Sequence, residues 1–212
     1  MIVRDLGLMP YRNAWTEQER VHAGVVAGDE EQLLLVEHPP VVTLGRRPGL
    51  IRNLIASPHQ LTQRGVELVE SDRGGDVTFH GPGQLVAYPI VRLIDHKLSV
   101  GGYVHRLEDA IIAALAPLGI PAHRDTCAVG VWLNRPNRPP AKLAAIGVRV
   151  RQGATLHGLA LNVFTDLSYF DLIVPCGLKD RAVTSVQCEA ASAVTMEQVK
   201  GHLVDAIRAA LL

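Results

Sequence analysis

The sequence contains a cysteine that could carry out nucleophilic chemistry. Cys176 lies between Pro175, which fixes φ, and Gly177, which frees it, so we expect a turn that could present the sulfur to a ligand. A small buried hydrophobe is the alternative, and that interpretation fits Cys127 and Cys188. Because a free thiol is mostly protonated at neutral pH, a nucleophilic Cys176 would need a nearby positive charge or base.

Lys142 is the one lysine between Lys97 and Lys179, and it follows Pro139 and Pro140 at the start of an apolar stretch. An isolated lysine is usually solvated, so alone it would indicate little. Its position beside a strand-like segment makes it a candidate only in combination with other residues.

The most unusual segment is glycine-rich: residues 73–84 read RGGDVTFHGPGQ, with Arg73 and His80 embedded. One explanation is two tight turns that flank a short strand. The other is that backbone amides and small residues leave room for a ligand against the chain. The segment lacks the Lys-Ser/Thr of a P-loop and the G-x-G-x-x-G dinucleotide pattern. Further along, residues 157–162 (HGLALN) place His157 and Asn162 in an apolar run, as expected of buried, hydrogen-bonded polar residues.

Composition and charge exclude several classes of protein. Hydrophobic residues make up 48% and charged residues 20% of the 212 residues, which is typical of a folded chain and favours one domain, residues 1–212. Lys and Arg (21) balance Asp and Glu (21), so no global basic field would bind nucleic acid or anionic lipid. No apolar run approaches the roughly 20 residues that span a bilayer, and Arg4 and Asp5 interrupt any signal peptide. Three widely spaced cysteines without a C-x-x-C pair favour a reduced, cytoplasmic, metal-free protein.

Hydrophobic periodicity predicts the elements that must position these residues. Helical stripes cover residues 11–27, residues 99–119 and the chain from Thr195, where Gln198 completes a capping box. Segments of strand length are residues 32–37, 41–44, 66–70, 85–92, 130–133, 143–151 and 155–164. Several strands follow one another without a helix between them. We therefore expect hairpins and an α+β fold with a mixed sheet flanked by helices.

Four segments in this order resemble the octanoyltransferases of lipoate biosynthesis: RGGDVTFHGPGQLVAYP, AKLAAIGVRV, HGLALNV and IVPCGL. The resemblance extends at least over residues 37–178 and includes EHPP at residues 37–40. It implies a fold like that of the biotin and lipoate protein ligases, and a catalytic dyad of Cys176 and Lys142. It also implies a substrate-binding site made of Arg73, Gly74, Gly75, Asp76, Val77, Thr78, Phe79, His80, Ala145, Ile146, Gly147, Gly158, Leu159 and Ala160.

The resemblance further implies the reaction and its partners. The donor would be octanoyl-acyl carrier protein. The acceptors would be lysines in the lipoyl domains of 2-oxoacid dehydrogenase complexes and in the glycine cleavage H protein. Cys176 would hold the octanoyl group as a thioester, and Lys142 would act either as an ammonium beside the thiolate or as a neutral base. A thioester donor needs no ATP, so no cofactor is expected. His80 is a second candidate for proton transfer, with a purely structural role as the alternative.

Acyl carrier proteins are acidic, so a local basic pair should receive one. The candidates are Arg46 with Arg47, Arg149 with Arg151, and Arg135 with Arg138. Three other functions remain open at this point. A ligase would activate a free acid with ATP and would not need Cys176, a cysteine hydrolase would pass the acyl group to water, and a binding module would not turn over.

Overall fold

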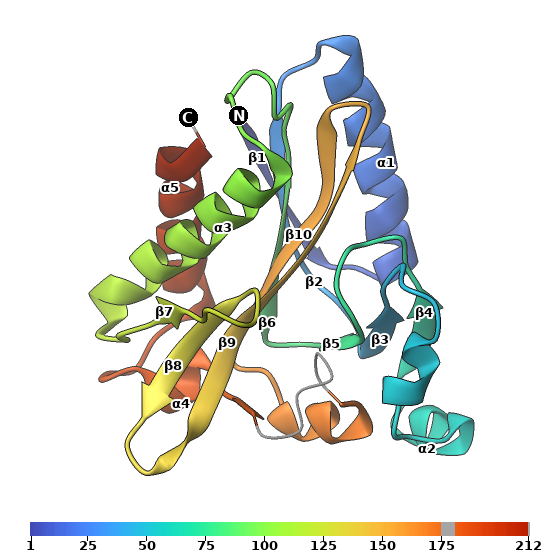
Figure 1. The fold of residues 1–212 in the computed structure, drawn as a ribbon, viewed down its shortest axis with the longest axis vertical. Helices are drawn as coiled ribbons and strands as arrows, with labels where there is room; N and C mark the ends of the chain where they lie inside the picture. Colours follow the sequence, from blue (N-terminus) through green and yellow to red (C-terminus); the bar gives the residue numbers. More distant parts are fainter. Residues whose placement is uncertain (175–180, 212) are drawn as a thin grey trace.

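The computed structural model describes residues 1–174 and 181–211, in which two β-sheets are flanked by helices (Figure 1). Within these residues the larger sheet has eight strands in the order β1-β2-β6-β10-β9-β8-β7, with β11 beside β9, and the smaller has the order β4-β3-β5. The strands are β1 (Ile2–Leu8), β2 (Gln32–Glu37), β3 (Val41–Leu44), β4 (Glu67–Glu70), β5 (Thr78–His80), β6 (Gln84–Ile90), β7 (His123–Arg124), β8 (Val131–Arg135), β9 (Arg138–Arg151), β10 (Ala154–Asn162) and β11 (Ala182–Val183). The helices are α1 (Tyr11–Ala27), α2 (Pro58–Gln63), α3 (Val100–Leu115), α4 (Val186–Glu189) and α5 (Met196–Leu211), with 3-10 turns at Leu50–Asn53, Ala116–Leu118 and Leu167–Leu172.

Both sheets are mixed. In the larger one, β1 pairs parallel with β2 and β11 parallel with β9, whereas β2-β6, β6-β10, β10-β9 and β9-β8 are antiparallel. In the smaller one, β3 is parallel to β4 and antiparallel to β5. The consecutive strands β8, β9 and β10 form hairpins, and this confirms the predicted α+β fold with a mixed sheet.

Helices cover both faces of the larger sheet. On one face, α3 and α5 bury Leu107 and Ile111 among other residues in the largest core. On the other face, α1 buries Ala14, Val21 and Val25 against β2, β6 and β10. These residues recur at the helical spacing that predicted the helices. None of the helices in the described part of the chain is long and apolar enough to cross a membrane.

The predicted helix starts are confirmed by their capping contacts. The Ser99 hydroxyl accepts a hydrogen bond from the Gly102 amide at 3.0 Å, directly before α3. Before α5, the Thr195 amide donates to the Gln198 side chain at 2.9 Å, and the Gln198 amide donates to the Thr195 hydroxyl at 3.2 Å. These pairs satisfy amides that lack partners in the first turn of a helix.

The first strand, β1, is the longest element that the sequence patterns did not predict. Its two charged residues, Arg4 and Asp5, interrupt the apolar alternation by which strands are found. β1 lies at the edge of the larger sheet beside β2. Its successive side chains point to opposite faces of the sheet, so Arg4 and Asp5 reach helices on different faces. Arg4 forms an ion pair with Glu17 of α1, and Asp5 forms one with Lys200 of α5 at 2.7 Å.

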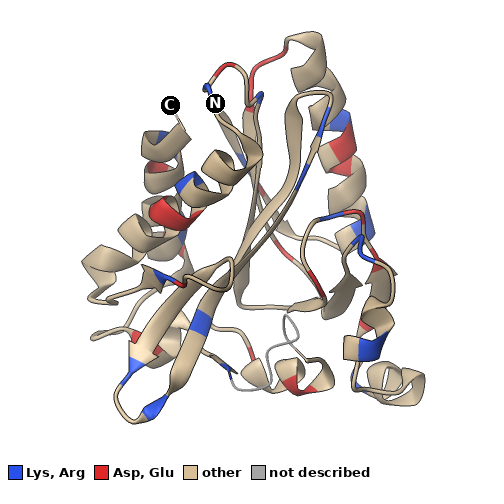
Figure 2. Cartoon of the chain, viewed as in Figure 1, with Lys and Arg blue, Asp and Glu red and all other residues tan. Residues whose placement is uncertain are grey.

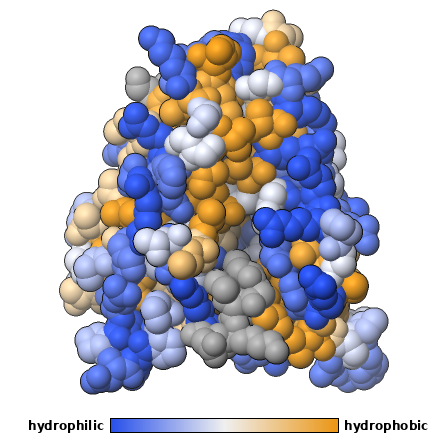
Figure 3. Space-filling model, viewed as in Figure 1, coloured by the Kyte–Doolittle hydropathy of each residue, from blue (hydrophilic) through white to orange (hydrophobic). Residues whose placement is uncertain are grey.

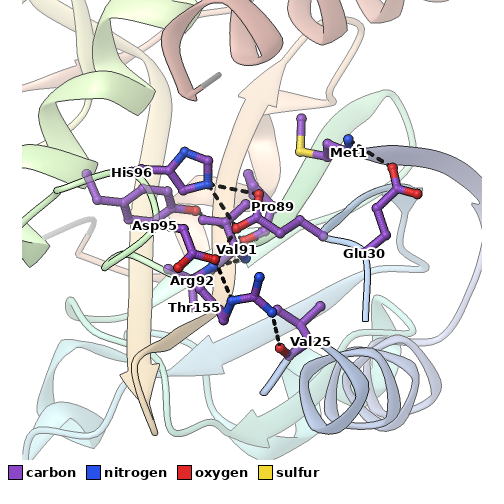
Figure 4. Close-up of polar contacts among 11 residues, drawn as sticks. Met1, Val25, Glu30, Pro89, Val91, Arg92, Asp95, His96 and Thr155 are labelled. Atoms are coloured by element: carbon purple, nitrogen blue, oxygen red, sulfur yellow. Dashed lines mark hydrogen bonds and ion pairs between the residues drawn. The ribbon is translucent and has the colours of Figure 1, made fainter. Parts of the chain in front are cut away.

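Polar contacts join the end of α1 to the ends of β6 and β10 (Figure 4). The Arg92 guanidinium donates to the Val25 carbonyl at 2.8 Å and pairs with Asp95 at 2.6 Å. The Thr155 hydroxyl donates to the Pro89 carbonyl at 2.7 Å. The Thr155 hydroxyl also accepts from the Val91 amide at 2.9 Å, so this side chain links β10 to the backbone at the end of β6.

Two glycines allow backbones to approach closely where β9 and β10 meet their neighbours. A Cβ at Gly158 would lie 2.1 Å from the Ala87 carbonyl oxygen, and a Cβ at Gly147 would lie 2.7 Å from the Gly74 carbonyl oxygen. The resemblance to octanoyltransferases predicts that Gly158 and Gly147 belong to the substrate site. The structure adds a second reason for them, since any side chain would push these backbones apart.

Candidate active site

A cavity of about 410 Å³ lies between the β9-β10 hairpin and the glycine-rich loop, residues 73–77. Further walls come from β5 and β6, from Tyr11 at the start of α1 and from residues 127–129 before β8. Figure 3 shows a band of hydrophobic residues on the face between α3 and α1. The cavity therefore draws together segments that lie far apart in the sequence.

Most of the predicted site residues that the structure describes lie on this cavity wall. They are Lys142, Arg73, Gly74, Gly75, Asp76, Val77, Thr78, His80, Ala145, Ile146, Gly147, Gly158, Leu159 and Ala160. The fold thus brings them together around one space, while their roles remain predictions.

Phe79 is the predicted substrate-binding residue that lies elsewhere. Its ring stacks on Tyr169, with ring centres 4.7 Å apart, and packs edge-on against Phe170 in a separate core beneath the smaller sheet. Side chains alternate between the two faces of a strand. β5 therefore directs Thr78 and His80 to the cavity and Phe79 away from it.

The glycine-rich loop is fixed against β9 and β3. The Gly74 amide donates to the Val148 carbonyl at 3.0 Å, which extends the edge of β9 with a backbone contact. The buried Arg73 guanidinium donates to the Thr43 carbonyl at 2.7 Å and to the Thr43 hydroxyl at 2.8 Å. Arg73 thereby pins the loop to β3 and places a positive charge beside the cavity.

Lys142 reaches the cavity from β9 and is buried, with 7% of its surface exposed. Its ammonium donates to the Val129 carbonyl at 3.1 Å and lies 4.6 Å from the ring centre of Trp132. β11 pairs with β9 here, with Val183 opposite Lys142. A buried amine in this position could stabilise a neighbouring anion or exchange a proton with it.

Cys176, the predicted nucleophile, lies outside the described residues. The chain is described up to Val174, whose amide donates to the Asn53 carbonyl at 2.8 Å. It is described again from Arg181, which directly precedes β11 and forms an ion pair with Asp125. The predicted pairing of Cys176 with Lys142 stays a prediction.

His80 belongs to a buried chain of side-chain hydrogen bonds. Its Nδ1 donates to Gln84 Oε1 at 2.7 Å, and Gln84 Nε2 donates to Asn162 Oδ1 at 2.9 Å. Asn162 in turn donates to the Thr184 carbonyl at 3.0 Å. With Nδ1 carrying the proton, the other ring nitrogen of a neutral His80 is an acceptor. The contacts fix the ring as a structural residue would require, and they also orient it for proton transfer.

His157 is buried in the cavity wall and forms a polar triplet with Asp72 and Arg149. Its Nε2 donates to an Asp72 oxygen at 2.6 Å, and the other Asp72 oxygen pairs with the Arg149 guanidinium. His157 has φ of 59°, a left-handed conformation that non-glycine residues rarely adopt. Arg149, a candidate for binding an acidic partner, is thus paired within the protein.

Tyr11 and Tyr88 also line the cavity, and His38 contacts both of their rings; none of the three was predicted. His38 donates from Nδ1 to the Met9 carbonyl at 2.7 Å, and the Tyr88 hydroxyl donates to its Nε2 at 2.8 Å. The Tyr11 ring stacks on His80, with ring centres 5.9 Å apart. The EHPP segment contained His38, but only the fold reveals which rings lie around it.

The other two cysteines correct an expectation from the sequence. Cys127 and Cys188 were interpreted as small buried hydrophobes, yet both are exposed free thiols. Cys127 lies in the loop between β7 and β8, where its amide donates to Asp125 at 2.8 Å. Cys188 lies in the single-turn helix α4. Short irregular segments of this kind carry no periodicity from which burial can be read.

Comparison with known proteins shows extensive similarity. The family model of the lipoyl protein ligase A/B catalytic domain matches residues 10–208. An octanoyltransferase of Koribacter versatilis is 53% identical over 203 residues, which cover 93% of this chain and 78% of that protein. An octanoyltransferase of Mycobacterium tuberculosis is 47% identical over 209 residues, covering 99% and 86%. A crystal structure of lipoate-protein ligase A bound with ATP has a TM-score of 0.79 at 20% identity, covering 100% of this chain and 86% of that one, and so shares its fold.

The two neighbouring buried histidines, His38 and His80, make folding stability depend on pH. Burial lowers the pKa of His38 to about 4 and, together with the neighbouring His38 and Arg73, the pKa of His80 well below 6.5. Each imidazole in the unfolded chain titrates near pH 6.5. Between these values the unfolded chain binds more protons than the folded chain. Acidification from about pH 6.5 therefore lowers the free energy of unfolding by up to about 1.4 kcal/mol per pH unit for each imidazole.

We expect the free energy of unfolding of the His38→Gln variant to depend less steeply on pH than that of the parent, because one buried imidazole is gone. This holds even if the variant is less stable at pH 7. Urea unfolding between pH 7 and pH 5 measures the slope. His59→Gln, which changes an exposed imidazole, serves as the control and should keep the slope of the parent. Equal slopes in the parent and in His38→Gln would contradict the assignment, and His80→Gln offers an independent second variant.

Proposed function

The chain belongs to the lipoyl protein ligase A/B catalytic family and is an acyltransferase, and we propose that it moves octanoyl groups from octanoyl-acyl carrier protein to acceptor lysines of lipoyl domains. Its octanoyltransferase relatives support octanoyl transfer in lipoylation. The proposed acceptors are the lipoyl domains of 2-oxoacid dehydrogenase complexes and the glycine cleavage H protein. Residues 1–212 act as one catalytic domain in this proposal, and the cytoplasmic location expected from the sequence stays a prediction.

The observation that carries the proposal is a buried lysine at a cavity lined by small residues. Lys142 shares this cavity with Ala145, Gly147 and Ala160, whose side chains take up little space. An eight-carbon chain buried there would contribute about 0.8 kcal/mol per methylene, or roughly 5 kcal/mol in all. The cavity therefore supports an acyl substrate whose reactive end lies near Lys142.

Two displacements on Cys176 account for the transfer. In the first, the Cys176 thiol gives up its proton and its thiolate attacks the thioester carbonyl of the carrier. A C–S bond to Cys176 forms, the C–S bond to the carrier breaks, and the departing carrier sulfur takes up the proton. In the second, the acceptor amine attacks the Cys176 thioester and an amide forms. The C–S bond to Cys176 breaks, and a proton from the amine passes to the Cys176 sulfur. Both thioesters are similar in energy and amide formation is downhill, so the cycle needs neither ATP nor another cofactor.

Lys142 serves this cycle in one of two ways. As an ammonium it stabilises the Cys176 thiolate and the negative charge of each tetrahedral intermediate. As a neutral amine it takes the thiol proton and later accepts one from the incoming lysine. His80 is the second candidate for proton transfer, because its contact with Gln84 fixes which ring nitrogen can accept.

The basic residues that could receive the acidic carrier differ in their local pairing. Figure 2 shows Lys and Arg distributed over several elements instead of gathered on one face. Arg149 is paired with Asp72 and Arg151 with Glu19. Arg46 and Arg47 are exposed, and within the described residues neither has a carboxylate partner. Because Arg47 also lines the cavity, this pair is the best-placed of the candidates for the carrier.

Reversing the charge of Arg46 and Arg47 together to Glu should raise the KM for octanoyl-acyl carrier protein and flatten its dependence on salt, with little change in kcat. Steady-state transfer at several ionic strengths measures both effects. Arg106→Glu together with Arg208→Glu, at exposed sites on α3 and α5, is the control with the same change in net charge. An unchanged KM in the Arg46/Arg47 variant would remove this pair from the docking surface.

The proposed reaction is tested by offering a lipoyl domain two octanoyl sources: octanoyl-acyl carrier protein without ATP, and free octanoate with ATP. We expect modification of the acceptor lysine only from the carrier, with the activity lost in Cys176→Ser and reduced at least a hundredfold in Lys142→Ala. Modification from octanoate and ATP that survives Cys176→Ser would instead establish a ligase. Free octanoate released without an acceptor would indicate a hydrolase.

A further inference from the structure

Trp132 lies on β8 opposite Lys142 of β9, and its ring contacts two cations. The Lys142 ammonium and the Arg181 guanidinium each lie 4.6 Å from the centre of its ring. The ring is 1% exposed, and its Nε1 donates to the Ala128 carbonyl at 3.0 Å, which fixes its orientation. The negative face of an indole ring attracts cations at this distance, and burial strengthens the attraction.

The two cations come from the two parts of the chain that the proposed reaction must bring together. Lys142 is on β9, and its ammonium also donates to the Val129 carbonyl. Arg181 is the first described residue after the segment that contains Cys176. Arg181 also forms an ion pair with Asp125, so Trp132 and Asp125 together fix the position of the Arg181 side chain.

The surrounding contacts make the cluster rigid. The amide of Gly130, two residues before Trp132, donates to the buried Glu108 carboxylate at 2.9 Å. A Cβ at Gly130 would lie 2.5 Å from the Ala144 carbonyl oxygen and 3.5 Å from the Lys142 ammonium. The Lys142 side chain therefore packs directly against the backbone of the loop before β8. An aliphatic residue at position 132 would leave part of the indole volume empty and would not attract either cation.

We propose that Trp132 is a positioning residue for acyl transfer, which holds the Lys142 ammonium and the Arg181 guanidinium on one ring. This inference rests on the proposed function of Lys142 and Cys176. The ring contacts no substrate in this scheme. It restricts where the Lys142 and Arg181 side chains can lie. Weakening its attraction for cations should then lower kcat and leave the KM values for donor and acceptor nearly unchanged.

Fluorinated tryptophans test this role, because ring fluorines weaken the attraction for cations while the shape stays similar. The chain has two tryptophans, so incorporation in a Trp15→Phe background labels Trp132 alone. We expect kcat to fall steadily with the number of ring fluorines, by roughly three- to tenfold over the series, at nearly constant KM. The control is the same series at Trp15 in a Trp132→Phe background, which should show no trend.

A kcat that does not change across the series at Trp132, or a loss that appears only in KM, would overturn the positioning role. Trp132→Phe, which keeps an aromatic face, should retain a higher kcat than Trp132→Leu, and equal losses would also count against the positioning role.

A second measurement does not depend on catalysis. The shift in urea midpoint caused by fluorination should shrink when Lys142→Met removes one cation, and an unchanged shift would contradict the contact. Transfer by the unfluorinated protein tests the proposed function separately.

Discussion

Close contact between backbones, without side chains between them, is the constraint on which the site depends. The glycine-rich loop hydrogen-bonds to the edge of β9 through Gly74 and Val148, and Gly147 leaves space for this approach. Gly45 does the same on the other side, where a Cβ would lie 2.3 Å from the Gly75 carbonyl oxygen. These contacts hold loop, hairpin and small sheet at a fixed spacing. The cavity is the space that remains between them. Its walls carry small residues because larger side chains would separate these backbones.

The cavity combines this apolar, small-residue wall with polar groups that are fixed by contacts inside the protein. His80 on the cavity wall and the neighbouring His38 are neutral because burial disfavours their charged forms, whereas Arg73 and Lys142 bring basic groups to the same space. Such an arrangement suits a neutral acyl chain whose reaction creates negative charge at one end. The same fold occurs in lipoate-protein ligase A bound with ATP, so the fold alone does not decide between a free acid and a thioester as the donor.

The sequence predicts the long periodic elements well, because burial of one face imposes a period that can be read directly. Residues 11–27, 32–37 and 41–44 form the predicted helix and strands with the same limits. Features that depend on partners distant in the sequence could not be predicted. The charged residues of β1 form ion pairs with residues of α1 and α5. Phe79 faces away from the cavity because side chains alternate along β5, and Arg149 is paired with Asp72. The contact of Lys142 with Trp132 also depends on the pairing of β8 with β9, which only the three-dimensional structure provides.

The central claim is that Cys176 carries the octanoyl group between donor and acceptor. The most direct test is mass spectrometry of the intact protein and its peptides after mixing with octanoyl-acyl carrier protein alone. The account predicts one octanoyl group on the Cys176 peptide, released by hydroxylamine, transferred when a lipoyl domain is added, and absent from Cys176→Ser and Lys142→Ala. Octanoylation of the lipoyl domain without any adduct on Cys176, or with full activity in Cys176→Ser, would contradict it.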